Sequence, residues 1–544
     1  MRFLNYYIGA FLLLALPSFA QQTIKEQDFS YTYKNSKIAI DFTTAAPSAV
    51  TAFDAITEQP IEVVKEATSY VLQNLKPAEI IRLEYGFGTS KAALQRSYLA
   101  NLSASTGAIN VYFNHAVDVT YSQGQNAVNL GNTLDDMLVT YINACTTTLD
   151  IAIYNSYSPS STTGIVGAIN TAYDRGVQVR LIYDGSTSSA MIPLLNPAIP
   201  ILASPTSSSY GIMHNKFVLF DAAVTDASKP IVWTGSTNWT VAQIDGPDTN
   251  SVITIQDQTL ALGYKIEFEE MWGSNTLTPN TTTSKFGPYK IDNTPHHYVI
   301  GGKTIDSYFS PSDGVNAKII ATINTANTDI DVATMLITRS DISSALIAKY
   351  NAGVNVNVVV DSQNPSGNQI SVLQSGLAPS HAVVFNGSGI MHHKFMVVDN
   401  YNSASDPLVL LGSHNWSSSA ETKNDENTLI VHDATIANLY YQAFIYLYQQ
   451  YGGVLSVSSH EVTPAALVVA PNPTSGWLSF MNTTTEPMDH VKVVVYDVLG
   501  AVLLEKDFDA FTTAAIDLSA QAHGVYFVTV TTNGKTIHYK IIKK

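Results

Sequence analysis

Two copies of a short segment bring a histidine and a lysine together at a fixed spacing. Residues 211–221 read GIMHNKFVLFD and residues 389–399 read GIMHHKFMVVD, and seven of the eleven positions are identical. A Gly-Ser-x-Asn turn follows each copy, at residues 235–238 and 412–415. Two imidazoles and two ammonium groups that converge would suit a phosphate diester. One imidazole can attack phosphorus, the other can protonate the leaving oxygen, and the remaining donors stabilise the charge that forms.

The alternation of side chains along a strand decides which of these groups point together. On a strand from residue 213 to 220, His214 and Lys216 share a face, and His392 and Lys394 share the equivalent face in the second copy. An aspartate ends each copy on the opposite face, away from a simple histidine–aspartate pair. The turns add neutral hydrogen-bonding groups for the phosphate, which are Ser236, Asn238, Ser413 and Asn415.

A single His-x-Lys is more often a structural feature of a strand, but duplication together with the turn favours a site built from two halves. A metal site is the weaker alternative. His214, His392 and His393 are available, but no cysteine or carboxylate completes a ligand set at metal spacing. The sequence therefore predicts no metal and no cofactor.

The repeat extends to the elements that must position these residues. Apolar strands, helical stretches and further strands recur in the same order on both sides of the chain. This pattern predicts β-α-β units with a mostly parallel sheet, and two α/β units packed with pseudo-twofold symmetry. The matched segments are 149–154 with 330–335, 164–175 with 342–352, 176–184 with 353–361, and 258–272 with 434–448.

The rest of the chain divides by composition. Residues 21–105 match nothing else and are predicted to be an accessory region, with strands in 29–42 and helices at 61–75 and 90–102. The C-terminal part is predicted to be a small all-β sandwich, with turn residues at 471–476 and a hairpin at Asn533-Gly534. The predicted boundaries are 1–20 for a signal peptide, 21–105 for the accessory region, 106–285 and 286–455 for the two repeats, and 463–544 for the C-terminal module.

Composition and the N-terminus indicate an exported protein. Arg2, an apolar run at 8–16 and Ser18-Phe-Ala20 have the pattern of a cleaved secretory signal, and the mature chain is expected to lack a membrane-spanning segment. Cys145 is the single cysteine, so no intramolecular disulfide can form, and it is interpreted as a core residue. The net charge of −16 argues against a large electrostatic nucleic-acid interface.

The duplicated segment resembles the two HKD motifs of the phospholipase D superfamily, over about residues 106–455. The resemblance implies metal-independent phosphodiester chemistry through a phosphohistidine, with transfer to water or another alcohol. Family members include phospholipases, nucleases, cardiolipin synthases and phosphatidylserine synthases. The catalytic residues that the resemblance implies are His214, Lys216, Asp221, His392, Lys394 and Asp399.

The family pattern also often includes a Glu-Asn pair after the turn. The second copy has it at Glu426-Asn427, whereas the aligned pair in the first copy is Thr249-Asn250. On this alignment only His392 has a carboxylate to orient it, through Glu426. The sequence leaves open which histidine attacks phosphorus.

The C-terminal module resembles the type A sorting domain of the type IX secretion system. The resemblance rests on the segments 471–476, 495–500 and 518–528 and on the terminal Lys540-Ile-Ile-Lys-Lys544. It implies passage through the type IX machinery, removal of the module, and a secreted or cell-surface location. An unrelated β-sandwich binding module is the alternative.

These observations predict a secreted phospholipase D-type phosphodiesterase, a hydrolase that degrades phospholipids by cleaving their headgroups. A secreted endonuclease of the same superfamily, with nucleic acid as its substrate, is the alternative. A surface adhesin that keeps the fold without catalysis is a third, but two intact motifs argue against it. Phosphatidylcholine or phosphatidylethanolamine is expected to be cleaved faster than DNA.

Overall fold

The computed structural model describes residues 22–34, 36–43, 45–87, 94–156, 159–362, 365–454, 467–482, 488–511, 513–532 and 535–544. The chain divides into two compact units, residues 1–454 and 455–544. The predicted signal peptide and the Asn533-Gly534 turn lie outside the described residues. Within the described part, no helix is both long and apolar enough to cross a membrane.

The first repeat is built on an eight-stranded sheet with the order β11-β10-β17-β16-β15-β12-β13-β14. Its central strands are continuous apolar runs, and both of their faces are buried by the layers on either side. The strands are β10 (Ile109–Phe113), β11 (Val128–Asn129), β12 (Thr148–Ile153), β13 (Gln178–Tyr183), β14 (Ile201–Ala203), β15 (Lys216–Phe220), β16 (Ile231–Gly235) and β17 (Ser251–Ile255). The helices are α1 (Leu134–Ala144), α2 (Pro159–Asp174), α3 (Val241–Ile244) and α4 (Gln258–Trp272).

The second repeat has the same order over seven strands, in the sheet β18-β19-β25-β24-β23-β20-β21-β22, and differs at the edge, where β18 pairs antiparallel with β19 while β11 pairs parallel with β10. The strands are β18 (His297–Ile300), β19 (Lys303–Ser310), β20 (Asp329–Thr334), β21 (Asn355–Asp361), β22 (Ala382–Phe385), β23 (Lys394–Val398), β24 (Leu408–Gly412) and β25 (Glu426–His432). The helices are α5 (Val315–Thr325), α6 (Ser340–Asn351), α7 (Ile370–Leu377), α8 (Ser418–Thr422) and α9 (Ala434–Gln450). The prediction of two matching α/β units is therefore confirmed.

Both sheets are mixed, and the prediction of a mostly parallel sheet was wrong. The parallel pairs β12–β13–β14 and β20–β21–β22 follow the β-α-β pattern. However, the motif strand β15 pairs antiparallel with both β12 and β16, and β23 does the same with β20 and β24. Each motif strand is thus in the middle of a sheet, with strands on both sides, and this fixes its position.

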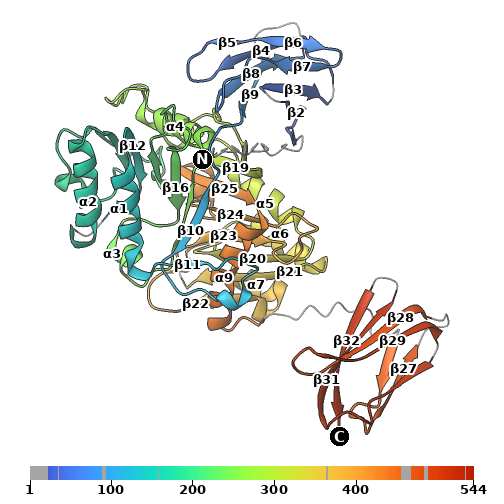
Figure 1. Cartoon of the computed structure of the whole chain (residues 1–544). Coiled ribbons are helices and arrows are strands. Elements are labelled where there is room, and N and C mark those ends of the chain that lie inside the picture. The colour runs from blue at the N-terminus through green and yellow to red at the C-terminus, as the bar shows by residue number, and fades with distance from the viewer. Residues whose placement is uncertain are drawn as a thin grey trace, which may run out of the picture. The chain divides into compact units, whose positions relative to one another are not determined.

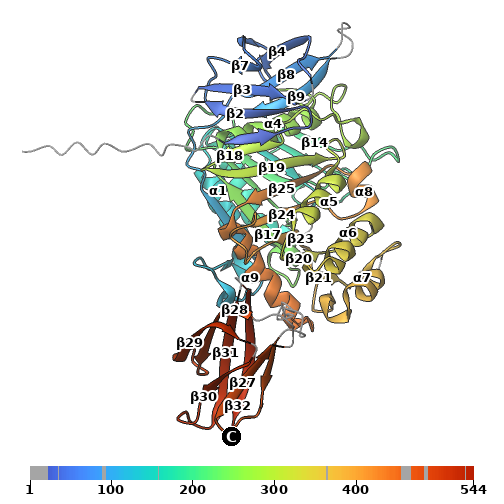
Figure 2. The ribbon, with the colours of Figure 1, turned by 90° about the vertical axis from the view of Figure 1, so that its right-hand side faces the viewer.

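Helices cover the outer side of each sheet. Figure 1 shows α1 and α2 beside the first sheet and α6 and α7 beside the second, on opposite sides of the pair of sheets. Figure 2 shows α5, α6 and α7 along one side of the second sheet. The apolar faces of these helices form one core in each repeat, centred on residues such as Ile151 and Ile169 in the first and Val332 and Leu346 in the second. The two rigid halves can therefore present their motif strands to each other.

The accessory region is made of strands where helices were predicted. It has two sheets, β1-β2-β3-β7-β6 and β5-β4-β8-β9, which share one core. The segment 61–75, predicted to be helical, contains β6 and β7, and the described part of 90–102 contains β9. The strands are β1 (Thr23–Lys25), β2 (Phe29–Lys34), β3 (Lys37–Phe42), β4 (Ala49–Asp54), β5 (Pro60–Ile61), β6 (Val63–Glu66), β7 (Ser69–Leu72), β8 (Ile80–Gly86) and β9 (Gln95–Ala100).

The C-terminal unit is all β, as predicted. A three-stranded sheet, β26-β27-β30, and a four-stranded sheet, β29-β28-β31-β32, share one apolar core that includes Leu478, Val493 and Val528. The strands are β26 (Leu467–Ala470), β27 (Trp477–Asn482), β28 (Met488–Tyr496), β29 (Val502–Phe511), β30 (Thr513–Asp517), β31 (Gly524–Thr532) and β32 (Lys535–Lys543).

Candidate active site

The two motifs meet because each half holds the other's motif backbone. The residue before each histidine forms an isolated bridge with the opposite repeat, Met213 with Asp425 and Met391 with Thr249. In the same register, the amide of His214 donates to the carbonyl of Asp425, and the amide of His392 donates to the carbonyl of Thr249, both at 2.9 Å. The reciprocal bonds place both histidines at the junction of the two halves.

An aspartate fixes each motif from within its own half. Asp184, just after β13, accepts from the amide of Met213 at 2.7 Å, and Asp361, the last residue of β21, accepts from the amide of Met391 at 2.6 Å. Both aspartates are buried. The backbone before each histidine is therefore held from two directions, and this preorganises the side chain that follows.

The two lysines are buried and close to each other. Lys216 begins β15 and Lys394 begins β23, and each ammonium donates to the carbonyl of the histidine two residues earlier, at 2.7 and 2.6 Å. Burial lowers the pKa of Lys394 to about 7, and burial together with the nearby charge of Lys394 lowers the pKa of Lys216 well below its ordinary value. An anion at this position would hold both lysines in the charged form.

The two histidines have different partners. His214 Nδ1 lies 2.8 Å from a carboxylate oxygen of Glu426, whereas His392 Nδ1 lies 3.0 Å from the amide oxygen of Asn250. Each partner comes from the opposite repeat. The expectation that Glu426 orients His392 is therefore wrong, because the carboxylate belongs to His214.

The register of the strands explains this error. Gly235 pairs with Val252, whereas Gly412 pairs with Thr428. The first repeat has one more residue between the turn and the strand, so the counterpart of Glu426 is Asn250 and not Thr249. The sequence alignment matched Thr249-Asn250 with Glu426-Asn427 because both pairs end in asparagine. That match hid the extra residue in the first repeat.

Burial and charge set the protonation of the histidines. Burial lowers the pKa of His214, and the adjacent Glu426 carboxylate works against this shift. Burial and the charge of Lys394 lower the pKa of His392 well below its ordinary value, with no carboxylate to oppose them. Both rings are thus neutral in the free protein near neutral pH, and His214 is the one whose positive form has a counter-charge in contact.

The two motif aspartates do not join this group. Asp221 accepts hydrogen bonds from the amides of Thr146, Thr147 and Thr148, in the turn that begins β12. Buried Cys145 in the same turn points its Sγ at the Thr148 carbonyl, 3.0 Å away. Although Asp221 was included in the predicted catalytic set, its carboxylate is fully engaged in holding this turn.

Asp399 has the same place in the second repeat. It accepts from the amides of Asn327 and Thr328, in the turn that begins β20. Burial works to raise the pKa of Asp399, but hydrogen bonds from Ser405, Thr328 and Asn327 outweigh it and hold the pKa below its ordinary value. The geometry gives both aspartates a structural place at the far end of the motif strands.

The Gly-Ser-x-Asn turns lie against the histidines' partners. Ser236 donates to the Asn250 oxygen at 3.1 Å, and Ser413 accepts from the amide of Asn427 at 3.1 Å. The side-chain oxygens of Asn238 and Asn415 are buried without a partner among the described residues. These oxygens can accept hydrogen bonds from a ligand, whereas only the NH2 groups of the same side chains can donate to a phosphate.

Two further histidines lie in the same region, His414, which sequence reasoning missed, and His393, which it considered only as a metal ligand. His414, inside the second turn, is buried; among the described residues its ring nitrogens make no hydrogen bond, its Nε2 lies 3.9 Å from a carboxylate oxygen of Glu421, and burial lowers its pKa to about 4. His393 lies between the motif residues His392 and Lys394, but its Nε2 lies 2.7 Å from Nε2 of His115. The described residues contain no cluster of three or more metal-ligating side chains.

Comparisons with known proteins agree with the duplicated architecture. A family model described as "Cardiolipin synthase, PLD-like domain" matches residues 138–272 and again 319–448, and one described as "Secretion system C-terminal sorting domain" matches residues 468–544. The mitochondrial cardiolipin hydrolase of Xenopus tropicalis is 33% identical over 143 residues, which are 26% of this chain and 64% of that protein. The phospholipase D of Rickettsia bellii is 26% identical over 170 residues, 30% of this chain and 82% of that protein.

A solved structure covers more of the chain at lower identity. The phosphatidylserine synthase of Haemophilus influenzae is 12% identical, covers 63% of this chain and 86% of its own, and has a TM-score of 0.45. The chain spans slightly less than two thirds of the Xenopus tropicalis relative. The sorting domain indicates secretion or attachment at the cell surface. The chain thus carries a duplicated phospholipase D-like region followed by a C-terminal secretion sorting domain.

Proposed function

We propose that this protein is a secreted phosphodiesterase that hydrolyses phospholipid headgroups through a phosphohistidine, with His214 as the nucleophile and His392 as the general acid. The observation that supports the assignment is the unequal pairing of the two rings. Nδ1 of His214 donates to Glu426, so Nε2 carries the lone pair, and the carboxylate balances the positive charge that a phosphorylated imidazole acquires. His392 has only a neutral amide as its partner and gives up a proton more readily.

The reaction then has two balanced steps. The anionic phosphate raises the pKa of His392 on binding, so His392 enters the first step protonated on Nε2. In that step, Nε2 of His214 bonds to phosphorus while the bond from phosphorus to the headgroup oxygen breaks, and Nε2 of His392 gives its proton to that oxygen. In the second, His392 takes a proton from water, the hydroxide attacks phosphorus, and the phosphorus–nitrogen bond breaks to release phosphatidic acid. Lys216, Lys394 and the side-chain NH2 groups of Asn238 and Asn415 stabilise the charge on the non-bridging oxygens in both steps.

A phospholipid is favoured over nucleic acid by charge and by the relatives. With a net charge of −16, the chain offers little counterion release to a polyanion. Relatives named cardiolipin hydrolase and phospholipase D support a lipid substrate.

Phospholipid vesicles and plasmid DNA, each offered to the full chain with EDTA, are the direct test. Lipid is expected to be cleaved faster, with EDTA having no effect because the cationic side chains neutralise the phosphate. DNA cleavage without lipid turnover would refute the lipid proposal.

The assignment of the histidines has its own test. His214→Ala and His392→Ala should each lower lipid turnover by about 10³-fold or more, without additivity in the double variant, because the two rings act as one unit. A substrate with a nitrophenyl leaving group needs no acid, so His392→Ala should still release about one equivalent of nitrophenol in a burst, whereas His214→Ala should release none. Near-normal lipid turnover in either variant contradicts the two-histidine mechanism, and a burst from His214→Ala reverses the roles.

A further inference from the structure

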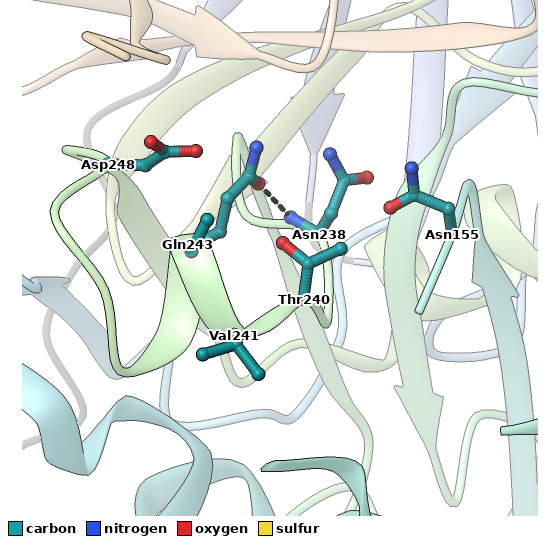
Figure 3. Close-up of a pocket in the computed structure, with 7 residues that line it drawn as sticks. Asn155, Asn238, Thr240, Val241, Gln243 and Asp248 are labelled. Atoms are coloured by element: carbon teal, nitrogen blue, oxygen red, sulfur yellow. Dashed lines mark hydrogen bonds between the residues drawn. The ribbon is translucent and has the colours of Figure 1, made fainter. Parts of the chain in front are cut away.

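A pocket lined largely by polar residue types adjoins the candidate active site on the side of the first repeat. It has a volume of about 320 Å³, at the small end of ligand pockets, and is lined by Asn155, Asn238, Thr240, Val241, Ala242, Gln243 and Asp248. Figure 3 shows the ends of Gln243, Asn238 and Asn155 side by side, with the Asp248 carboxylate beyond Gln243. The size suits a headgroup and excludes a pair of acyl chains.

Two residues that line the pocket are close in sequence or by hydrogen bond to residues next to the two histidines. Asn155 follows Tyr154, whose ring lies 4.9 Å from the ring of His214 and 5.1 Å from the ammonium of Lys216. On the other side, Asp248 precedes the segment that holds His392, and it accepts from the amide of Ile390 at 2.8 Å. A group bonded to a phosphate at the two histidines would therefore reach this pocket.

The pocket presents hydrogen-bond acceptors that lack donors. Asn155 is 7% exposed and Asn238 is 4% exposed, and the side-chain oxygens of both have no partner among the described residues. The side-chain oxygen of Gln243 already has a donor, because it accepts a hydrogen bond from the backbone N–H of Asn238 at 2.6 Å. Asp248 adds a buried carboxylate. Buried acceptors without partners favour a ligand that donates hydrogen bonds.

One lining position of the pocket differs in polarity between the two repeats. Strands β12 and β20 occupy equivalent positions in the two repeats. Asn155 is the second residue after β12 and Leu336 is the second residue after β20, so leucine occupies the place of the asparagine. Asp248 likewise corresponds to Asn424, which accepts from the amide of Ile212 as Asp248 does from that of Ile390. The second repeat therefore lacks the equivalent of the Asn155 oxygen, so the two sides of the phosphate differ in one hydrogen-bond acceptor.

We infer that this pocket selects headgroups that donate hydrogen bonds, such as the primary ammonium of ethanolamine or the hydroxyls of glycerol, over the trimethylammonium of choline. This inference rests on the proposed lipid hydrolysis. Choline has no donor for the oxygens of Asn155 and Asn238, and its cation is bound in proteins by aromatic faces. None of the described residues that line the pocket is aromatic. A site built to bond a donor discriminates strongly against an analogue without one, because its buried groups are then left unpaired.

A series of lipids with equal charge tests the inference. Phosphatidylethanolamine, its N-methyl and N,N-dimethyl derivatives and phosphatidylcholine are presented to the full chain in detergent micelles at equal mole fraction. We expect kcat/KM to fall along the series by at least about tenfold. Phosphatidylglycerol is the separate arm for hydroxyl donors and should also be cleaved faster than phosphatidylcholine. Selectivity in the methylated series alone would restrict the pocket to ammonium donors and overturn the hydroxyl half of the inference.

Asn155→Leu connects the selectivity to the pocket by copying the residue of the other half. It should reduce the ratio of kcat/KM for phosphatidylethanolamine to that for phosphatidylcholine to about one. The matched control is Asn351→Leu at the exposed end of α6, which should keep the ratio of the unaltered protein. Equal cleavage of all lipids by the unaltered protein overturns the inference and leaves the proposed function standing. Absence of any lipid cleavage overturns both.

Discussion

At the scale of single residues, two histidines that are equivalent in sequence differ in the charge of their partner. Glu426 contacts His214, and its charge also raises the pKa of Lys394 against the larger effect of burial. Removing that charge in Glu426→Gln therefore lowers the pKa of both groups. We expect turnover to fall by about 10²- to 10⁴-fold, since the phosphorylated ring loses its counter-charge.

The pH profile separates this role from a merely structural one. kcat/KM should fall at low pH as His214, which must be neutral to attack, gains a proton. It should fall at high pH as His392, the general acid, and Lys394, which must be charged to bind phosphate, lose their protons. The low-pH limb is expected to move to lower pH in Glu426→Gln, because His214 loses the carboxylate that raises its pKa. Glu62→Gln, an exposed substitution in the accessory region, should leave profile and rate unchanged. Reduced turnover with an unmoved profile would show that Glu426 only supports the fold.

At the scale of elements, the buried strands were predictable and their order in the sheet was only partly so. The apolar runs in β12, β13, β20 and β21 identify them as strands, and the intervening helices predict their parallel pairing. The motif strands return antiparallel to the middle of each sheet, and no local pattern encodes that partner. In the accessory region, the segment 61–75 has a helical composition but is folded as strands by its pairing with β3.

The candidate site shows the same division. His214, Lys216 and their counterparts were found from the repeat alone, because their spacing carries the signal. The contact between Glu426 and His214 was not predicted, because it joins the two repeats and its position depends on one extra residue in the first repeat. The sequence alignment included Asn250 but matched it with Asn427, whereas its counterpart in the structure is Glu426.

The aspartates that end β15 and β23 give a prediction at this scale. Asp221 and Asp399 have φ angles of 51° and 53°, a backbone conformation that aspartate and asparagine tolerate better than alanine. Asp221→Ala should therefore lose its turn hydrogen bonds and gain strain, and lower the free energy of unfolding by about 2 to 4 kcal/mol. Asp221→Asn keeps one acceptor oxygen and the backbone preference, so its loss should be smaller.

Denaturant unfolding measures the decrease in the free energy of unfolding of Asp221→Ala. Turnover at low temperature, where the variant is folded, shows whether the active site is intact. The aspartate is bound to the turn before β12, so the folded variant should keep turnover within about threefold of the unaltered protein, in contrast to the loss expected at a reacting group. An Asp221→Ala protein of unchanged stability that lacks activity would instead return Asp221 to the catalytic set.

At the scale of the whole molecule, catalysis and export are expected to reside in different units. Every residue of the candidate site lies in the unit that ends at residue 454, and the C-terminal unit has a core of its own. Residues 468–544 match a secretion sorting domain. Deleting residues 455–544 should therefore leave kcat/KM of the purified protein unchanged within about twofold, because every residue of the candidate site is kept.

The same deletion should abolish export in the native host. The truncated protein is expected to accumulate in the periplasm, since the module that the type IX machinery recognises is missing, while His214→Ala in the full chain should reach the surface or the medium normally. Cell fractionation followed by immunoblotting distinguishes the two. This pair of variants separates address from catalysis, because each loses one property and keeps the other. Normal release of the truncated protein would contradict the sorting role, and loss of turnover on deletion would show that the second unit takes part in the reaction.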